Sequence, residues 1–198
     1  MIVAAGVNDS ILVVVLASAV VYGTPLLYAA LGELLAERSG VLNLGVEGMM
    51  LVGAVMGFWG VQRTGSLSVA ILVAALAGAA MALIHAFLVI TMRANQIVSG
   101  LALTLFAGAV GLSSYLGNDL NLADQPARHA FSSVLPDSWR HARVVGPVLF
   151  DQSVLVYASW ICVILIGLYL TRTRAGLNLR AVGESPAAAD AMGINVAR

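Results

Sequence analysis

Long apolar runs are the feature that most restricts how this chain can fold. Five such runs follow one another along the sequence, each near the 20 residues that a helix needs to cross the hydrocarbon core of a bilayer. They cover residues 10–31, 41–61, 67–92, 97–116 and 153–170 approximately. Only 10% of the residues are charged, whereas soluble domains have about 25%. The sequence therefore predicts an all-α, polytopic transmembrane helical bundle that forms one domain over residues 1–198.

The polar stretches between the runs predict how the chain is oriented. We expect residues 32–40 to form a short interfacial segment, 117–152 an external loop and 171–198 a cytoplasmic loop. Arg172, Arg174 and Arg180 lie close to a membrane end, which favours the cytoplasmic side for the C-terminus. Five spans then place the N-terminus outside. The first ten residues lack the basic start of a secretory signal, so we expect the first run to be retained.

Composition excludes several classes of function. The net charge is zero, which gives no electrostatic case for binding nucleic acid. Cys162 is the single cysteine, so an internal disulfide and a multi-cysteine metal site are excluded. The chain has no Lys, and therefore no Gly-rich loop ending in Lys-Ser/Thr that could cradle the phosphates of ATP. We expect no metal and no cofactor on this chain.

Small residues recur at four-residue spacing within the apolar runs. Such residues let helices approach closely in lipid, where the hydrophobic effect does not drive association. The spacing predicts a tightly packed bundle. The pairs are Gly53 and Gly57, Ala75 and Ala79, Gly78 and Ala82, and Ala107 and Gly111.

Polar residues at the start of the second run are the first candidate site. Asn43 and Glu47 are four positions apart, which places them on one face of a helix. Charged groups inside a membrane usually face the bundle interior or a cavity. The pair is therefore either a polar point on a translocation path or a structural partner, with Arg38 or Arg93 as possible counter-ions for Glu47.

The start of the fourth run is the second candidate site. Asn95 is interpreted as a helix cap. Gln96 and Ser99 either line a cavity or have a structural role. His85 lies late in the third run, and Ser99 is the one serine that suggests a catalytic partner for it, but no supporting acid or nucleophile motif surrounds them. A structural hydrogen bond of His85 is the favoured interpretation.

The polar tail contains the strongest local signal. Ser185 followed by Pro186 is typical of a helix start, and Gly193 suits the residue just past a helix end. The pattern predicts a helix over 186–192, which is too short to be stable alone in water and needs a partner surface. Its alanines, among them Ala187 and Ala188, would let it sit deep in a groove, and Glu184 and Asp190 could face basic groups there. An ordinary cytoplasmic connector is the alternative.

Three blocks of sequence are similar to the permease subunits of bacterial ABC importers for simple sugars and nucleosides. They are GELLAERSGVLNLGVEGMMLVGA (32–54), ANQIVSGLALTLFAG (94–108) and GLNLRAVGESPAAADAMGI (176–194). The similarity is greatest to the shorter permease of nucleoside systems that are fed by a lipoprotein binding protein. Such permeases usually have further spans beyond the third block, whereas this chain stops soon after it, so either the chain is a fragment or the protein is truncated.

The resemblance implies a bacterial inner-membrane location and a set of partners. These are an ABC ATP-binding subunit that carries ATP and Mg²⁺, a second permease, an external substrate-binding protein, a small polar solute and membrane lipid. The 176–194 loop would be the coupling helix, with Gly183, Glu184, Ala188 and Gly193 at matching positions. The 117–152 loop would face the binding protein, with Trp139, Arg140 and Arg143 as the expected contacts.

Three functions remain to be distinguished at this stage. The first is a permease without enzymatic activity, driven by a docked ATPase and carrying a nucleoside or simple sugar; branched-chain amino acids rank lower. The second is an ion-coupled transporter or channel that uses Glu47. The third is an intramembrane enzyme that uses His85 and Ser99.

Overall fold

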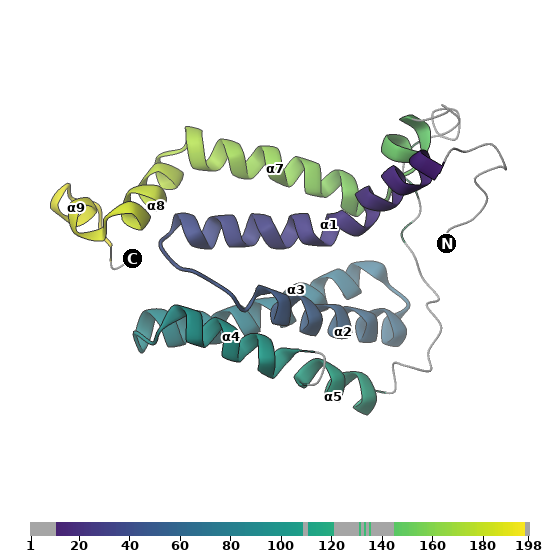
Figure 1. Ribbon diagram of the computed structural model, residues 1–198, viewed down its shortest axis with the longest axis horizontal. Helices are drawn as coiled ribbons and strands as arrows, with labels where there is room; N and C mark the ends of the chain where they lie inside the picture. Colours follow the sequence, from purple (N-terminus) through teal and green to yellow (C-terminus); the bar gives the residue numbers. More distant parts are fainter. Residues whose placement is uncertain are drawn as a thin grey trace. The chain divides into compact units, whose positions relative to one another are not determined.

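The computed structural model describes residues 11–108, 111–120, 131, 133, 135 and 145–196, and these residues are mainly helical. Figure 1 shows the helices in chain order. They are α1 (Ile11–Arg38), α2 (Val46–Thr64), α3 (Leu67–Ala86), the π-helix η1 (Phe87–Thr91), α4 (Gln96–Ala107), α5 (Leu112–Asp119), the π-helix η2 (Gly146–Phe150), α7 (Val154–Arg172), α8 (Arg174–Glu184) and α9 (Pro186–Ala191). Extended pairing in the described part is limited to a bridge between Ser133 and Ser153. The all-α fold class is confirmed.

Four helical stretches are long and apolar enough to cross a membrane. They are Ile11–Arg38, Leu67–Thr91, Gln96–Asp119 and Val154–Arg172. The second expected span, now α2, has a lower hydropathy than these four, because Glu47 lies in its first turn and Arg63 in its last. The chain is a multi-pass membrane protein, and four helical stretches among the described residues meet both the length and the hydropathy of a span.

Helix α1 is longer than expected. We predicted that it would end near residue 31 and that residues 32–40 would form a separate interfacial segment. The structure continues α1 to Arg38 because Glu33, Leu34, Leu35 and Ala36 are good helix formers, and the helix ends where Gly40 adopts a left-handed backbone with φ +87°.

Two other boundaries differ from the expected spans. The second span was expected from residue 41, but α2 begins at Val46 and residues 41–43 are not helical. The fourth was expected to continue to residue 116, but α4 ends at Ala107, where Gly108 takes an extended conformation. Ala107 and Gly111 therefore do not share one helix.

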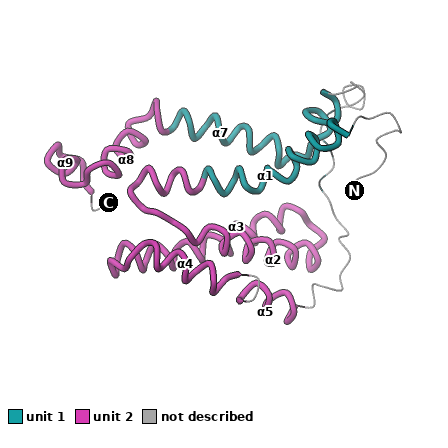
Figure 2. The backbone as a smooth tube through the Cα atoms, viewed as in Figure 1, with its two compact units in different colours: residues 1–31, 131–169 teal, residues 32–130, 170–198 magenta. Residues whose placement is uncertain are grey.

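The described chain divides into two compact units (Figure 2). The first contains residues 1–31 and 131–169, and within it α7 runs beside α1. The phenol Oη of Tyr28 donates to the Leu155 carbonyl oxygen at 2.8 Å, which ties the two helices together. At the start of α7, the side-chain amide of Gln152 donates to the carbonyls of Pro147 and Val148 and closes η2 onto the helix.

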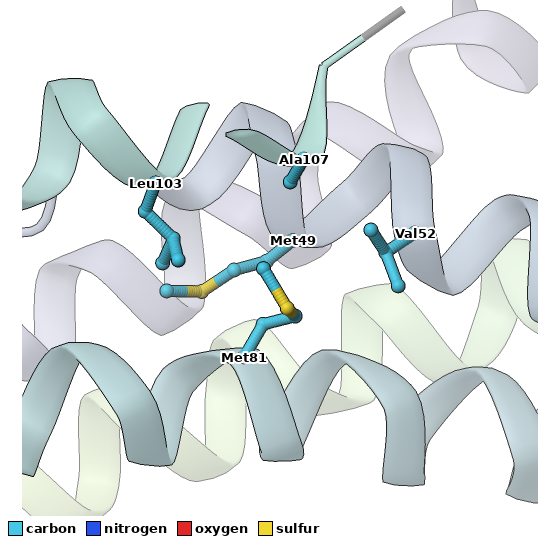
Figure 3. Close-up of a cluster of buried hydrophobic side chains, with 5 residues drawn as sticks. All are labelled: Met49, Val52, Met81, Leu103 and Ala107. Atoms are coloured by element: carbon cyan, nitrogen blue, oxygen red, sulfur yellow. The ribbon is translucent and has the colours of Figure 1, made fainter. Parts of the chain in front are cut away.

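The second unit contains residues 32–130 and 170–198, and its core lies between α2, α3 and α4. Figure 3 shows the buried side chains that meet there. They are Met49, Val52, Met81, Leu103 and Ala107. Methionine is unbranched and adapts to irregular gaps, so the two methionines fill the space between helices whose backbones approach unevenly.

Glycines set the spacing between α2 and its neighbours. A Cβ atom at Gly57 would lie 3.1 Å from Ala74 Cβ on α3, and one at Gly48 would lie 2.9 Å from Ala107 Cβ on α4. Gly53 also faces α3, where its added Cβ would lie 3.3 Å from the Ala74 carbonyl oxygen. The close packing predicted for Gly53 and Gly57 is therefore present.

Candidate functional site

The chain between α1 and α2 is a non-helical stretch of residues 39–45, here called the joining segment. The Gly40 N–H donates to the Glu37 carbonyl at 3.0 Å, and the Val41 N–H donates to the Ala36 carbonyl at 3.0 Å. These bonds close the end of α1. Backbone groups outside a helix need other hydrogen-bond partners, so the remaining partners of this segment define the site.

Gln96, the first residue of α4, binds the middle of the joining segment. Its Oε1 accepts from the Leu42 N–H at 2.7 Å, and its Nε2 donates to the Gly40 carbonyl at 3.4 Å. Asn95 holds the same end of α4, because its Oδ1 accepts from the Ile97 and Val98 N–H groups. The cap interpretation of Asn95 is confirmed, and Gln96 has a structural contact that its sequence context did not identify.

Glu33 and Thr104 bind the second half of the joining segment. Glu33 Oε1 accepts from the Asn43 N–H at 2.9 Å, and the Thr104 hydroxyl donates to the Leu44 carbonyl at 2.7 Å. Asn43 folds its own Oδ1 back to the Gly45 N–H at 3.0 Å. Helices α1 and α4 thus supply side-chain partners to backbone that has no helical partner. We did not identify Glu33 as a site residue, since its polar neighbours suggested an interfacial location.

His85 and Ser99 meet inside the second unit. His85 Nδ1 lies 3.1 Å from Ser99 Oγ, and its Nε2 lies 3.3 Å from the Leu42 carbonyl oxygen. A carbonyl can only accept, so in the neutral ring Nε2 carries the proton and Nδ1 accepts from the serine hydroxyl. The side chains are 3% and 7% exposed. The structural hydrogen bond favoured for His85 is present.

The same pair bears on the enzyme hypothesis. A nucleophilic serine needs a base that a third group orients, and access for a substrate. Here the second ring nitrogen contacts a backbone carbonyl, and both side chains are buried. The arrangement fits a structural bridge between α3, α4 and the joining segment better than a catalytic pair.

Glu47 lies in the first turn of α2 and is exposed. Among the residues that the structure describes, it forms no hydrogen bond or ion pair, and so neither Arg38 nor Arg93 is its counter-ion. Asn43 and Glu47 do not share a helical face either, because Asn43 lies in the joining segment before α2 begins. The carboxylate that binds the joining segment is that of Glu33.

The polar tail forms two consecutive helices, where we expected one. Thr173 caps α8, accepting from the Gly176 N–H at 3.0 Å. Ser185 ends α8 and caps α9, accepting from the Ala188 N–H at 3.4 Å, and Pro186 takes the first position of α9. Gly193 follows in a left-handed conformation with φ +83°. Helix α9 covers Pro186–Ala191, close to the expected 186–192.

Most of α9 is open. Ala189 is buried, whereas Pro186, Ala187, Ala188 and Asp190 are exposed, as is Glu184 at the end of α8. Met192, directly after the helix, is 83% exposed. A large apolar side chain at that exposure beside a row of alanines forms a small apolar surface that the tail does not cover. We did not single out Met192 from the sequence.

Gly183, near the end of α8, lies against the start of the joining segment. A Cβ atom placed on Gly183 would collide with the Arg38 carbonyl oxygen and would lie 3.0 Å from the Gly40 backbone nitrogen. A Cβ atom on Gly40 would in turn lie 3.3 Å from Gly183 Cα. Two glycines therefore allow α8 to touch the chain at the end of α1.

The residues proposed to contact a binding protein, Trp139, Arg140 and Arg143, lie outside the described residues. Within the range 117–152, the structure describes the end of α5 and the π-helix η2.

Comparison with known proteins places these features in a family. Residues 15–198 match the family model described as the branched-chain amino acid transport system / permease component. No solved structure matches the chain significantly.

Curated relatives carry sugar and nucleoside names. The chain is 40% identical to a putative glucose ABC transporter permease protein of Haloferax volcanii over 176 residues, covering 87% of this chain and 52% of that protein. It is 35% identical to a nucleoside ABC transporter permease protein of Lactococcus lactis and 36% identical to a guanosine ABC transporter permease protein of Bacillus subtilis. These two matches cover 92% and 94% of this chain and 60% of each relative. The chain thus spans about half to three fifths of the length of these relatives.

Proposed function

The chain belongs to the family of branched-chain amino acid transport system permease components, and from this premise we propose that it forms part of the translocation path of an ATP-driven importer. ATP and Mg²⁺ bind to a separate ATPase subunit, and this chain performs no hydrolysis. A second permease and an external substrate-binding protein complete the assembly. With α2 counted as a span beside the other four, the C-terminus faces the cytoplasm and the N-terminus faces outward, in the inner membrane of a bacterial cell.

The observation that carries this proposal is the exposure of α9. A six-residue helix is not stable alone in water, yet α9 is built with a serine cap, a proline start and a left-handed glycine stop. Its alanines and Met192 are exposed, and Asp190 and Glu184 flank them. Such a surface suits a groove of apolar floor and basic rim on the ATPase. The docking residues are Gly183, Glu184, Ser185, Pro186, Ala187, Ala188, Asp190 and Gly193.

The four polar residues expected near the path, Asn43, Glu47, Gln96 and Ser99, divide into two groups. Gln96, Ser99 and Asn43 use their polar atoms on contacts within the chain, and we assign them to holding the joining segment in place. Glu47 is exposed and has no partner in the described part of the chain, so it is the one of the four that is available to face the path.

The transported solute is a nucleoside or a simple sugar. The relatives named above include glucose, nucleoside and guanosine permeases, whereas the family description refers to branched-chain amino acids. Identity of 35–40% to the sugar and nucleoside proteins supports those solutes over amino acids.

The test is reconstitution of the complete importer in liposomes with its ATPase, second permease and binding protein. We expect uptake of labelled guanosine or glucose that requires internal ATP, while labelled leucine is not taken up. Uptake that continues without the ATPase subunit, or that is driven by a proton or sodium gradient alone, would contradict the proposal.

A further inference from the structure

We propose that the joining segment transmits movement of α8 and α9 to α3 and α4, and that Gln96 is the positioning residue through which it does so. This inference rests on the proposed function, because it concerns how docking of an ATPase changes the membrane helices. All the contacts involved lie within the second compact unit.

The first link is the contact between α8 and the end of α1. Gly183 lies so close to the Arg38 carbonyl and the Gly40 nitrogen that a single added carbon atom would collide with them. Groups in contact at this distance repel strongly when pushed together. A displacement of α8 toward the segment is therefore passed to residues 38–40 rather than absorbed by a gap.

The second link joins the same residues to α4. Gln96 contacts Gly40, the residue that meets Gly183, and also Leu42, two positions further on. Its amide therefore spans the part of the joining segment that α8 touches. Since Gln96 is the first residue of α4, a shift of the segment moves the start of that helix directly.

The third link extends to α3. The Leu42 carbonyl accepts from His85, and the other nitrogen of that ring contacts Ser99 one turn into α4. Leu42 is thus held through its N–H by α4 and through its carbonyl by α3. Both bonds are partly buried, so breaking either one costs free energy, and the segment moves with the two helices instead.

The joining segment is held at several further points along its backbone, so it has little freedom to move independently of the helices. The Val41 N–H is tied to Ala36, the Asn43 N–H to Glu33 and the Leu44 carbonyl to Thr104. Gly100 adds a close contact, because a Cβ atom there would lie 2.8 Å from the Leu44 nitrogen.

The test uses the assembled importer in liposomes and measures three quantities: co-purification of the ATPase subunit, ATP hydrolysis, and solute taken up per ATP hydrolysed. The labelled probe is guanosine or glucose, whichever the wild-type importer transports. For Gln96→Leu we expect normal co-purification and continuing hydrolysis, with uptake per ATP reduced about tenfold. Gln96→Glu keeps the acceptor for the Leu42 N–H and should recover part of the uptake.

The second variant acts at the other end of the route. Gly183→Ala should also lower uptake per ATP, because its methyl group displaces α8 from residues 38–40. The matched control is Gly23→Ala on α1, where an added Cβ meets nothing within 4 Å, and coupling should remain normal. Since Gly183 lies outside the apolar spans, this variant decides the matter if Gln96→Leu fails to assemble.

Outcomes for this inference and for the proposed function are distinct. If Gly183→Ala, or an assembled Gln96→Leu, retains wild-type uptake per ATP, the transmission route is wrong while the importer stands. If the wild-type assembly itself shows no ATP-dependent uptake, the proposed function fails first.

Discussion

Nδ1 of His85 lies 3.1 Å from Oγ of Ser99, and the opposite nitrogen of the same ring lies 3.3 Å from the carbonyl oxygen of Leu42. One imidazole therefore forms hydrogen bonds with two groups that come from different parts of the chain. His85→Ala leaves both without a partner, whereas Ser99→Ala affects only one ring nitrogen. We expect losses in the free energy of unfolding of about 2 and about 1 kcal/mol respectively.

Thermal unfolding of the detergent-solubilised protein measures this difference. Leu83→Ala is the control, since Leu83 lies on the same helix and is exposed. Equal losses for the serine and histidine variants would show that the Leu42 contact does not contribute.

Glu33 should stabilise the fold through the hydrogen bond that its Oε1 accepts from the Asn43 N–H. Glu33→Gln keeps an acceptor for the Asn43 N–H, but Glu33→Ala leaves that group unpaired. We expect the alanine variant to lose about 1–3 kcal/mol and the glutamine variant much less, measured by denaturant unfolding in micelles. A glutamine variant as unstable as the alanine variant would mean that the charge, and not the hydrogen bond, is required.

Glu47 separates the ATP-driven function from the ion-coupled alternative. Because Glu47 makes no contact within the described part of the chain, Glu47→Gln should assemble normally and should retain ATP-driven uptake. Uptake assays in liposomes with imposed proton or sodium gradients measure this. Loss of uptake in the variant, together with gradient-driven uptake in the wild type, would favour the ion-coupled transporter.

Gly48 should tolerate a methyl group poorly. An added Cβ would lie 2.9 Å from Ala107 Cβ and 3.0 Å from the Leu103 carbonyl oxygen, so α2 and α4 must separate. Overpacking of this kind costs about 1–3 kcal/mol. Gly78→Ala on α3 is the matched control, because its nearest neighbour outside the helix backbone is the Met49 carbonyl oxygen at 3.9 Å. A melting temperature that falls equally for both variants would contradict the packing argument.

Ser185 should influence docking through helix stability alone. Ser185→Ala removes the acceptor for the Ala188 N–H and costs about 1 kcal/mol in a helix that has little stability to lose. We expect the ATPase subunit to bind about fivefold more weakly, a ratio that corresponds to this free energy. Ser185→Asp keeps a capping oxygen and should bind normally. Equal weakening by both variants would indicate direct contact of the hydroxyl with the partner.

The parts of the fold that were predictable depend on neighbours in sequence. Ser185, Pro186 and Gly193 act on the backbone within a few residues of themselves, so the bounds expected for α9 could be read locally. The apolar runs could also be read locally, because the lipid core requires every backbone group to be paired within a helix. The extension of α1 to Arg38 was missed because charged side chains suggested an interface, although their helix propensity decided the backbone.

The polar network was not predictable for a different reason. Leu42 and Gln96 are separated by 54 positions, and Leu42 and His85 by 43. The sequence around each residue does not indicate these contacts, because they depend on how α3 and α4 pack against α2. Asn43 and Glu47 looked like a pair because a helix was assumed to begin at residue 41, and they are not one because it begins at Val46.

The scattered origin of the partners of the joining segment has a consequence for biogenesis. When Leu42 leaves the ribosome, the two side chains that bind its backbone have not yet been made, and Gln96 emerges 54 residues later. Until then this stretch depends on water, lipid headgroups or the insertion machinery for its hydrogen bonds. Its closure is therefore a late event of membrane insertion, completed only when α4 has joined the hairpin of α2 and α3.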